Sequence, residues 1–94
     1  MTINAIFACS DLLGIAAINA AAKNHIAVPN DLIIVGFDNI KYSVMSSPTL
    51  TTASQPMFQM GYRCSEMLYQ LIVNPSAQLQ SVVLQTELII REST

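Results

Sequence analysis

Two short apolar runs separated by an alanine-rich stretch most constrain how this chain can fold. The runs cover residues 5–9 and 32–37, and the second is rich in β-branched side chains. Their length and composition are typical of strands buried on both faces, as strands of parallel sheets usually are. We therefore expect two buried strands with a helix between them.

The stretch between the two runs has the signals of a helix. Ser10 suits the N-cap position, and Asp11 suits the positive end of a helix. From Leu12 to Ala22 the apolar residues recur at helical spacing. In a strand–helix–strand unit the right-handed crossover rule makes the strands parallel, so their carboxyl ends share one edge. Ser10, Asp11 and Asp38 are expected at that edge, where open α/β sheets bind ligands.

The second half of the chain is expected to contain one long helix and returning strands. Residues 39–47 favour a short helix or an irregular segment, and residues 49–52 have strand character. Residues 57–73 place apolar side chains at i, i+3, i+4 and i+7, which predicts an amphipathic helix. Residues 82–84 and 86–91 read as one or two strands.

Composition excludes several classes of protein. The 94 residues are 52% hydrophobic and 11% charged, with four basic and six acidic side chains. This is too apolar for a disordered segment, and four basic residues cannot form the stripe that phosphate-backbone binding needs. We expect one small domain or part of one, without direct DNA contact. The two cysteines, Cys9 and Cys64, do not form a disulfide framework and are expected to be small core residues.

No signal for catalysis, metal binding or export is found. The sequence lacks a phosphate-binding glycine loop, a nucleophile elbow and zinc-ligand spacing, so we expect neither an enzyme nor a cofactor. A nucleophilic Cys9 would need a base, and His25 is the one histidine. The apolar start has no basic residue before it and contains Asp11, which costs about 2.5 to 3.5 kcal/mol in a membrane span. A cytoplasmic location without membrane contact is therefore expected.

Several segments, taken in order and spacing, carry a resemblance to a known family. They are Ala5-Ile6-Phe7-Ala8-Cys9-Ser10-Asp11, Val28-Pro29-Asn30-Asp31-Leu32, Val35-Gly36-Phe37-Asp38-Asn39, Leu50-Thr51-Thr52 with Gln55-Pro56 and Gly61, and Thr86-Glu87-Leu88 with Arg91-Glu92-Ser93. Together they cover nearly the whole chain. The set resembles the effector-binding domain of the lactose-repressor and galactose-repressor (LacI/GalR) family of bacterial transcription regulators.

The resemblance implies an α/β fragment of a two-lobed, periplasmic-binding-protein-like fold with a parallel βαβ core. The chain resembles the last third of such a regulator. Residues 1–54 would belong to the second (C-terminal) lobe, residues 55–75 to a helix of the first lobe, and residues 76–94 to returning C-terminal strands. The helix-turn-helix and the first-lobe sheet would be absent, so DNA would be reached only through that missing part.

The same resemblance implies a role in effector binding, with a sugar or a nucleoside or purine as the effector. Asp38 matches an effector-contacting aspartate; the alternative is that it only caps residues 39–44. Ser10 stands where many members have an asparagine that contacts effector, although capping is favoured as its single role. Asp11 would line the pocket or, as we favour, support the helix start.

A twofold subunit interface is also implied, which predicts a homodimer. Its expected contributors are Ile15, Tyr42, Val44 and Met45, although Ile15 could equally belong to the core because its helix must bury one face. Two alternatives remain at this point. The chain could be a stand-alone interaction subunit that pairs with full-length regulators, or part of a sugar-binding transport receptor.

The long helix leads to a first prediction. A chain of this length buries only about 60 to 65% of its unfolded surface, and the apolar stripe of residues 57–73 would remain exposed. The protein is therefore expected to be marginally stable, self-associating or partly molten. Sedimentation velocity combined with a thermal melt tests this, and a monomer with a sharp two-state transition would contradict it.

Overall fold

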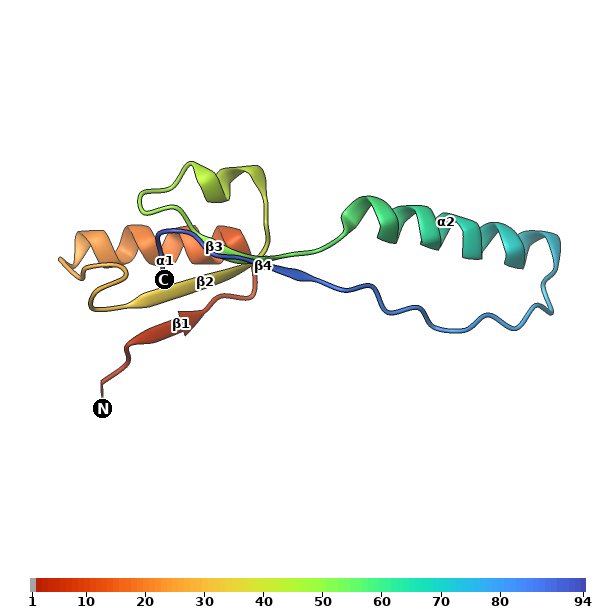
Figure 1. The fold of residues 1–94 in the computed structure, drawn as a ribbon, viewed down its shortest axis with the longest axis horizontal. Coiled ribbons are helices and arrows are strands. Elements are labelled where there is room, and N and C mark those ends of the chain that lie inside the picture. Colours follow the sequence, from red (N-terminus) through yellow and green to blue (C-terminus); the bar gives the residue numbers. More distant parts are fainter. Residues whose placement is uncertain (1) are drawn as a thin grey trace. The chain divides into compact units, whose positions relative to one another are not determined.

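Four strands form one mixed sheet in the order β1-β2-β3-β4 (Figure 1). The computed structural model describes residues 2–94 and divides the chain into two compact units. The first unit contains the residues up to Gln55 together with Glu87–Thr94, and the second is Pro56–Thr86. The sheet belongs to the first unit. Its strands alternate with helices along the chain, which confirms the α/β class expected from the sequence.

The first unit is built from short elements. They are β1 (Ala5–Phe7), α1 (Asp11–Lys23), β2 (Ile33–Asp38), the 3₁₀ helix η1 (Lys41–Val44), β3 (Thr51–Ser54) and β4 (Glu87–Ile89). β1 pairs with β2 in parallel, and β2 with β3 in parallel, whereas β4 is antiparallel to β3. The parallel βαβ unit predicted from the sequence is therefore confirmed.

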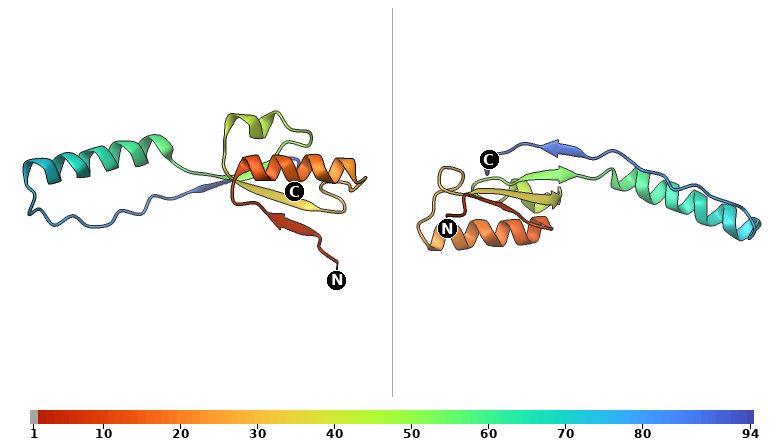
Figure 2. Two further views of the ribbon diagram at one scale, coloured as in Figure 1. Left: turned by 180° about the vertical axis from the view of Figure 1, so that it is seen from behind. Right: turned by 90° about the horizontal axis from the view of Figure 1, so that it is seen from below.

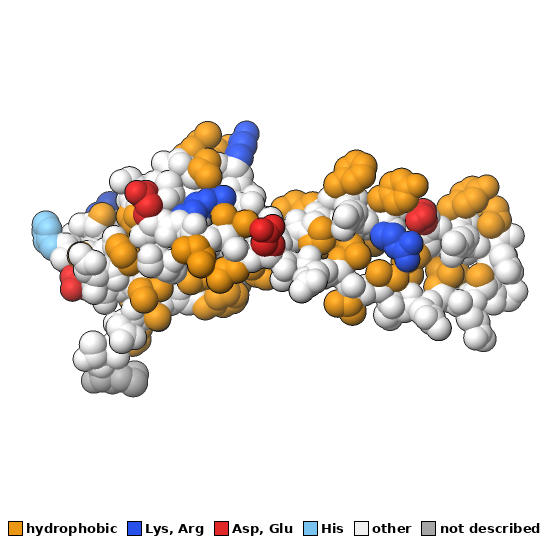
Figure 3. All heavy atoms as spheres, in the orientation of Figure 1, with side chains coloured by type: hydrophobic (Ala, Val, Ile, Leu, Met, Phe, Trp, Pro, Cys, Tyr) orange, Lys and Arg blue, Asp and Glu red, His pale blue; other side chains and the backbone are white. Residues whose placement is uncertain are grey.

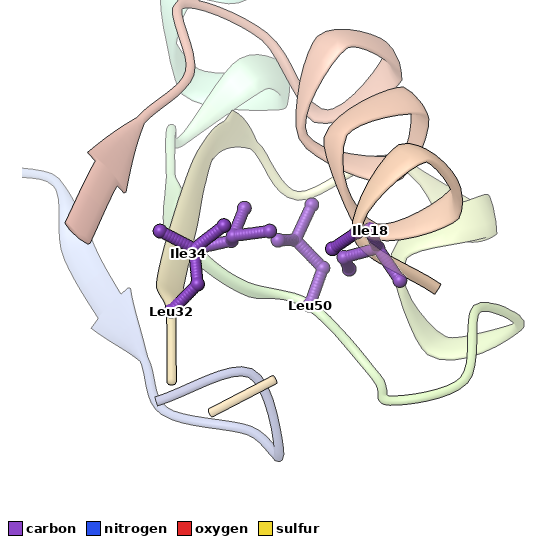
Figure 4. Close-up of a cluster of buried hydrophobic side chains, with 5 residues drawn as sticks. Ile18, Leu32, Ile34 and Leu50 are labelled. Carbon is purple, nitrogen blue, oxygen red and sulfur yellow. The ribbon is translucent and has the colours of Figure 1, made fainter. Parts of the chain in front are cut away.

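α1 covers one face of the sheet (Figure 2), and the core lies between the two. It consists of a small cluster of buried side chains: Ile18, Ala21, Leu32, Ile34 and Leu50. In Figure 4, Leu50 lies between Ile34 of β2 and Ile18 of α1. Removing the isoleucine and leucine side chains from water stabilises the unit by about 1.5 to 3 kcal/mol each.

The expectation that the first two strands are buried on both faces is wrong. All three residues of β1 are exposed, and the exposed fraction of Phe7 reaches 66%. In β2, Ile34 and Gly36 are buried while Ile33, on the opposite face, is 40% exposed. The physical reason is that α1 covers one face of the sheet, whereas apolar side chains on the other face remain open to solvent.

The second unit is built around one long helix. α2 runs from Met57 to Val73, as the apolar spacing predicts, and none of its residues is buried. Hydrophobic side chains lie on its surface in Figure 3, and Phe58 is 85% exposed. The exposed apolar stripe is therefore confirmed, whereas residues 82–84 form no strand. Among residues 2–94 no helix is both long and apolar enough to cross a membrane.

The cysteines are not core residues as expected, because both are exposed. Cys9 follows β1, whose side chains lack cover, and Cys64 lies on α2, which buries none of its residues. The small apolar thiol is favoured in a core only where a second layer packs over it. Neither cysteine has such a layer here.

One glycine in β2 is required by close packing. A Cβ on Gly36 would collide with Oδ1 of Asp11 and would approach Cδ2 of Leu50 to 2.8 Å. Gly61 is the opposite case, because a Cβ placed there meets no atom within 4 Å. The two glycines therefore provide a matched pair of alanine substitutions.

Gly36→Ala is expected to lower the free energy of unfolding by about 1 to 3 kcal/mol, because the methyl group overpacks a site bounded by Asp11 and Leu50. Gly61→Ala is expected to raise it by about 0.5 to 1 kcal/mol, since alanine is the better helix former and has open space. Urea denaturation followed by circular dichroism measures both. Equal effects of the two substitutions would show that the packing around Gly36 is described incorrectly.

Candidate functional site

The carboxyl ends of three parallel strands meet at one edge of the sheet. Ser10 and Asp11 follow β1, Asp38 ends β2, and Ser54 and Gln55 lie at the end of β3. The structure therefore brings the three predicted effector contacts to one edge, together with polar residues from a third strand. Such edges are where open α/β sheets bind ligands.

Ser10 begins the helix that follows β1. Its backbone is extended, and its Oγ accepts a hydrogen bond of 3.3 Å from the backbone N–H of Leu13. That geometry is an N-cap, so the capping role expected for Ser10 is confirmed. Ser10 as a whole is half-buried.

Asp11 lies beneath the edge and is fully buried. Its Oδ1 accepts a 2.6 Å hydrogen bond from the hydroxyl of Thr52, and its Oδ2 accepts a 2.9 Å bond from the backbone N–H of Ile40. Both carboxylate oxygens are thus used inside the protein. This arrangement ties the start of α1 to β3 and to the segment after β2, which is a structural task.

Asp38 presents its carboxylate at the edge. It is half-buried, and its Oδ1 accepts a 2.5 Å hydrogen bond from the side-chain amide of Gln55. The alternative that Asp38 caps residues 39–44 is wrong, because the N-cap residue of η1 is Ile40 and its N–H bonds to Asp11. Asp38 is therefore available for other hydrogen bonds.

Two residues of the edge were not predicted as site residues. Gln55 contacts Asp38, and Asn39 donates through Nδ2 to Oγ of Ser54 at 3.2 Å. The adjacent Asp-Asn pair was a usable signal, since both residue types tolerate the left-handed conformation that tight turns need. Gln55 could have been found only by knowing that β3 runs parallel to β2.

The predicted interface residues fall into two groups. Tyr42 and Val44 on η1, and Met45 directly after it, expose 48%, 56% and 70% of their surface. Ile15 is half-buried and packs against the core cluster. The structure therefore places three of the four on an open surface and one partly in the core.

The chemistry of the edge is that of hydrogen bonding to polar groups. No group of three or more His, Cys, Asp or Glu that could hold a metal ion occurs among residues 2–94. A carboxylate, a carboxamide and hydroxyls can accept from and donate to the vicinal hydroxyls of a sugar.

A hollow of about 250 Å³ in the second unit is lined by Phe58, Gln59, Tyr62, Arg63 and Leu84. None of the predicted site residues belongs to this lining. It contains mostly exposed apolar side chains of α2 and offers few convergent polar groups, unlike the edge.

Comparison with known proteins identifies relatives for almost the entire chain. The family described as periplasmic binding protein-like domain matches residues 2–94. The HTH-type transcriptional regulator MalR of Clostridium butyricum is 42% identical over 91 residues, covering 97% of this chain and 27% of the relative. The Ribose operon repressor of Haemophilus influenzae is 36% identical over 89 residues, covering 95% and 27%.

A solved structure shows the same similarity. A LacI family transcriptional regulator from Enterococcus faecalis V583, with bound ribose, superposes with a TM-score of 0.88 at 33% identity. The match covers 96% of this chain and 34% of that one. The chain thus spans about a quarter of the length of the curated relatives it matches.

The role of Asp11 leads to a stability prediction. Asp11→Ala is expected to lower the free energy of unfolding by about 2 kcal/mol or more, because the buried hydroxyl of Thr52 and the partly buried N–H of Ile40 lose their acceptor at about 1 to 3 kcal/mol each. Urea denaturation at fixed protein concentration measures the change.

Asp31→Ala is the control for this substitution. Asp31 is exposed and accepts one hydrogen bond, at 3.1 Å, from the backbone N–H of Ala27. Its loss is expected to cost less than about 1 kcal/mol, since both groups can bond to water instead. A cost for Asp31→Ala as large as that for Asp11→Ala would contradict the structural role of the buried carboxylate.

Proposed function

The chain belongs to the family of periplasmic binding protein-like domains, and from that premise we propose that it carries the effector-contacting edge of a bacterial transcriptional regulator. Its relatives are transcriptional regulators rather than enzymes. In this proposal the chain is the C-terminal part of an effector-binding region that responds to a sugar or a nucleoside. DNA contact belongs to another part of the regulator, and the role of this chain is non-catalytic.

The observation that carries the proposal is the position of the Asp38 carboxylate. It lies at the carboxyl edge of a parallel sheet with Gln55 on Oδ1, so further lone pairs can accept hydrogen bonds from neighbouring ligand hydroxyls. Hydrogen bonds to a charged acceptor contribute about 1.5 to 3 kcal/mol each. Two such bonds would make Asp38 the dominant contact from this side of a pocket.

Effector binding would act on the regulator through the same edge. β3 ends beside Asp38, and β4 pairs with β3 through Glu87 opposite Ser54. A ligand held at Asp38 would favour one arrangement of the two lobes, with β3 and β4 leading from one lobe to the other. Coupling free energies of about 1 to 3 kcal/mol are usual for such switches.

The proposed regulator is a homodimer. Tyr42, Val44 and Met45 form an exposed apolar surface on and next to η1, and α1 contacts η1. An exposed apolar surface suits a twofold interface, in which the same patch of both subunits is buried. Ile15 would contribute from α1 with the part of its side chain that the core leaves uncovered.

Ribose is the probe of choice for the effector. One relative is named a ribose operon repressor, and one similar structure contains ribose. Ribose is also the sugar of a nucleoside, so it presents the hydroxyls that both effector classes share. A single edge provides only part of a pocket, and the free chain is expected to bind effector weakly or not at all.

The function is therefore tested in a chimera. The matching segment of the Haemophilus influenzae Ribose operon repressor is replaced by this chain, and ribose binding is measured by calorimetry. Asp38→Ala in the chimera is expected to weaken ribose binding by about tenfold or more, because charged-acceptor hydrogen bonds of about 1.5 kcal/mol or more are lost.

The control is Asp31→Asn, which neutralises an exposed carboxylate just before β2, at the opposite end of that strand from Asp38. It is expected to leave ribose binding unchanged. A folded chimera that binds ribose equally well with and without the Asp38 carboxylate would refute the proposed contact. Adenosine in place of ribose distinguishes a nucleoside effector from a free sugar.

A further inference from the structure

The Asp38 carboxylate is presented by two consecutive residues in an unfavourable backbone conformation. Asp38 has a φ of 110° and Asn39 a φ of 56°, and neither is glycine. Residues other than glycine rarely adopt positive φ, and this conformation persists only where surrounding contacts hold it. The position of the carboxylate therefore depends on what holds this two-residue turn.

Asn39 is held through its backbone and through both ends of its side-chain amide. Its backbone N–H donates to Oγ1 of Thr52 at 3.3 Å, and its Nδ2 donates to Oγ of Ser54 at 3.2 Å. Its Oδ1 accepts from Nη2 of Arg91 at 2.7 Å and from Oγ of Ser43 at 3.4 Å. The bond from Arg91 is the shortest of these four and has a charged donor, which makes it the strongest.

Arg91 reaches Asn39 from 52 positions further along the chain. Its other terminal nitrogen, Nη1, donates to Oγ of Ser43 at 2.6 Å and to the backbone carbonyl of Leu50 at 3.0 Å. The planar guanidinium thus spans η1, the start of β3 and the Asn39 turn, which the single ammonium of a lysine could not do.

The charge of Arg91 is not used for an ion pair. The ion pair found among residues 2–94 is that of Arg63 with Glu66 on α2. Arg91 is half-buried and directs its donors to neutral oxygens from separate segments. The charge strengthens each of these hydrogen bonds, and the planar fork directs them to separate segments at once.

The segment that carries Arg91 is itself fixed to the sheet. The backbone N–H of Arg91 donates to Oγ1 of Thr51 at 2.8 Å. Ser93 is fully buried, accepts from the backbone N–H of Thr51 at 2.8 Å and donates to the carbonyl of Ile34. Glu92 accepts two hydrogen bonds from Thr49, one from its backbone N–H and one from its hydroxyl. Both lower the pKa of the Glu92 carboxyl, and the backbone bond has the larger effect. The guanidinium therefore extends from a fixed base.

We propose that Arg91 is a positioning residue of the effector edge, which acts through Asn39 to hold the left-handed turn that presents the Asp38 carboxylate. The inference rests on the proposed function for the role of Asp38 in effector contact. The proposal that Arg91 fixes the turn is supported by its hydrogen bond to Asn39 and can be tested without any effector.

The test uses the full 94-residue chain, labelled with ¹⁵N and ¹³C, and the variant Arg91→Lys. A residue with positive φ gives a strong intraresidue amide–Hα NOE, so Asn39 reports the turn. His25, with a φ of 57° at the end of α1, is an internal reference that Arg91 does not contact. The Arg91→Lys chain is expected to lose the Asn39 signal and keep that of His25.

Controls and a second variant make every outcome informative. Arg63→Lys on α2 should leave both signals unchanged. If Arg91→Lys loses both signals because it unfolds, Asn39→Gly decides, since glycine accepts positive φ while removing the acceptor of Arg91. In Asn39→Gly, an Asp38 amide that becomes mobile on the ¹⁵N relaxation time scale supports the proposal. An Asn39 signal retained in Arg91→Lys, or unchanged amide order in Asn39→Gly, overturns it.

Ribose affinity of the chimera gives the functional consequence. Arg91→Lys is expected to weaken ribose binding by about 2- to 30-fold, the range for residues that act through others, whereas Arg63→Lys should not. A chimera that binds no ribose even with Arg91 present would refute the proposed function, and the NOE experiment would still decide the positioning role. Unchanged affinity in Arg91→Lys, where the parent chimera binds ribose, would overturn the proposal.

Discussion

The arrangement of the edge depends on one buried carboxylate. Asp11 accepts a hydroxyl hydrogen bond from β3 and a backbone hydrogen bond from the segment that leads into η1. Two segments that are distant from it in sequence are thus fixed to the first residue of α1. Gly36 makes this possible, because a larger residue would occupy the space of the carboxylate. A buried carboxylate is tolerated only with such partners, so the edge must form as a unit.

Features with local determinants could be predicted from the sequence. The N-cap at Ser10, the limits of α2 and the parallel pairing of β1 and β2 follow from cap residues, apolar spacing and the crossover rule. Strand burial could not be predicted, because it depends on distant elements. Strand burial requires a second layer on the other face of the sheet, and short apolar runs contain no information on whether that layer is present.

The same distinction applies to the candidate site. The edge positions of Ser10, Asp11 and Asp38 follow from parallel strands, whereas their partners do not. Thr52, Gln55 and Arg91 reach the edge from 41, 17 and 52 positions away from the residues they bond. No spacing rule predicts such contacts. The asparagine at position 39 was a usable signal for the turn, since asparagine is enriched among residues in the left-handed conformation.

In the proposed regulator Asp38 recognises the effector, and the residues around it support its position. A crystal structure of the ribose-repressor chimera with ribose tests that division most directly. We expect ribose hydroxyls within hydrogen-bond distance of the Asp38 carboxylate, while Asp11 keeps its bonds to Thr52 and Ile40. Ribose bound elsewhere, or bound with Asp38 uncontacted, would contradict it.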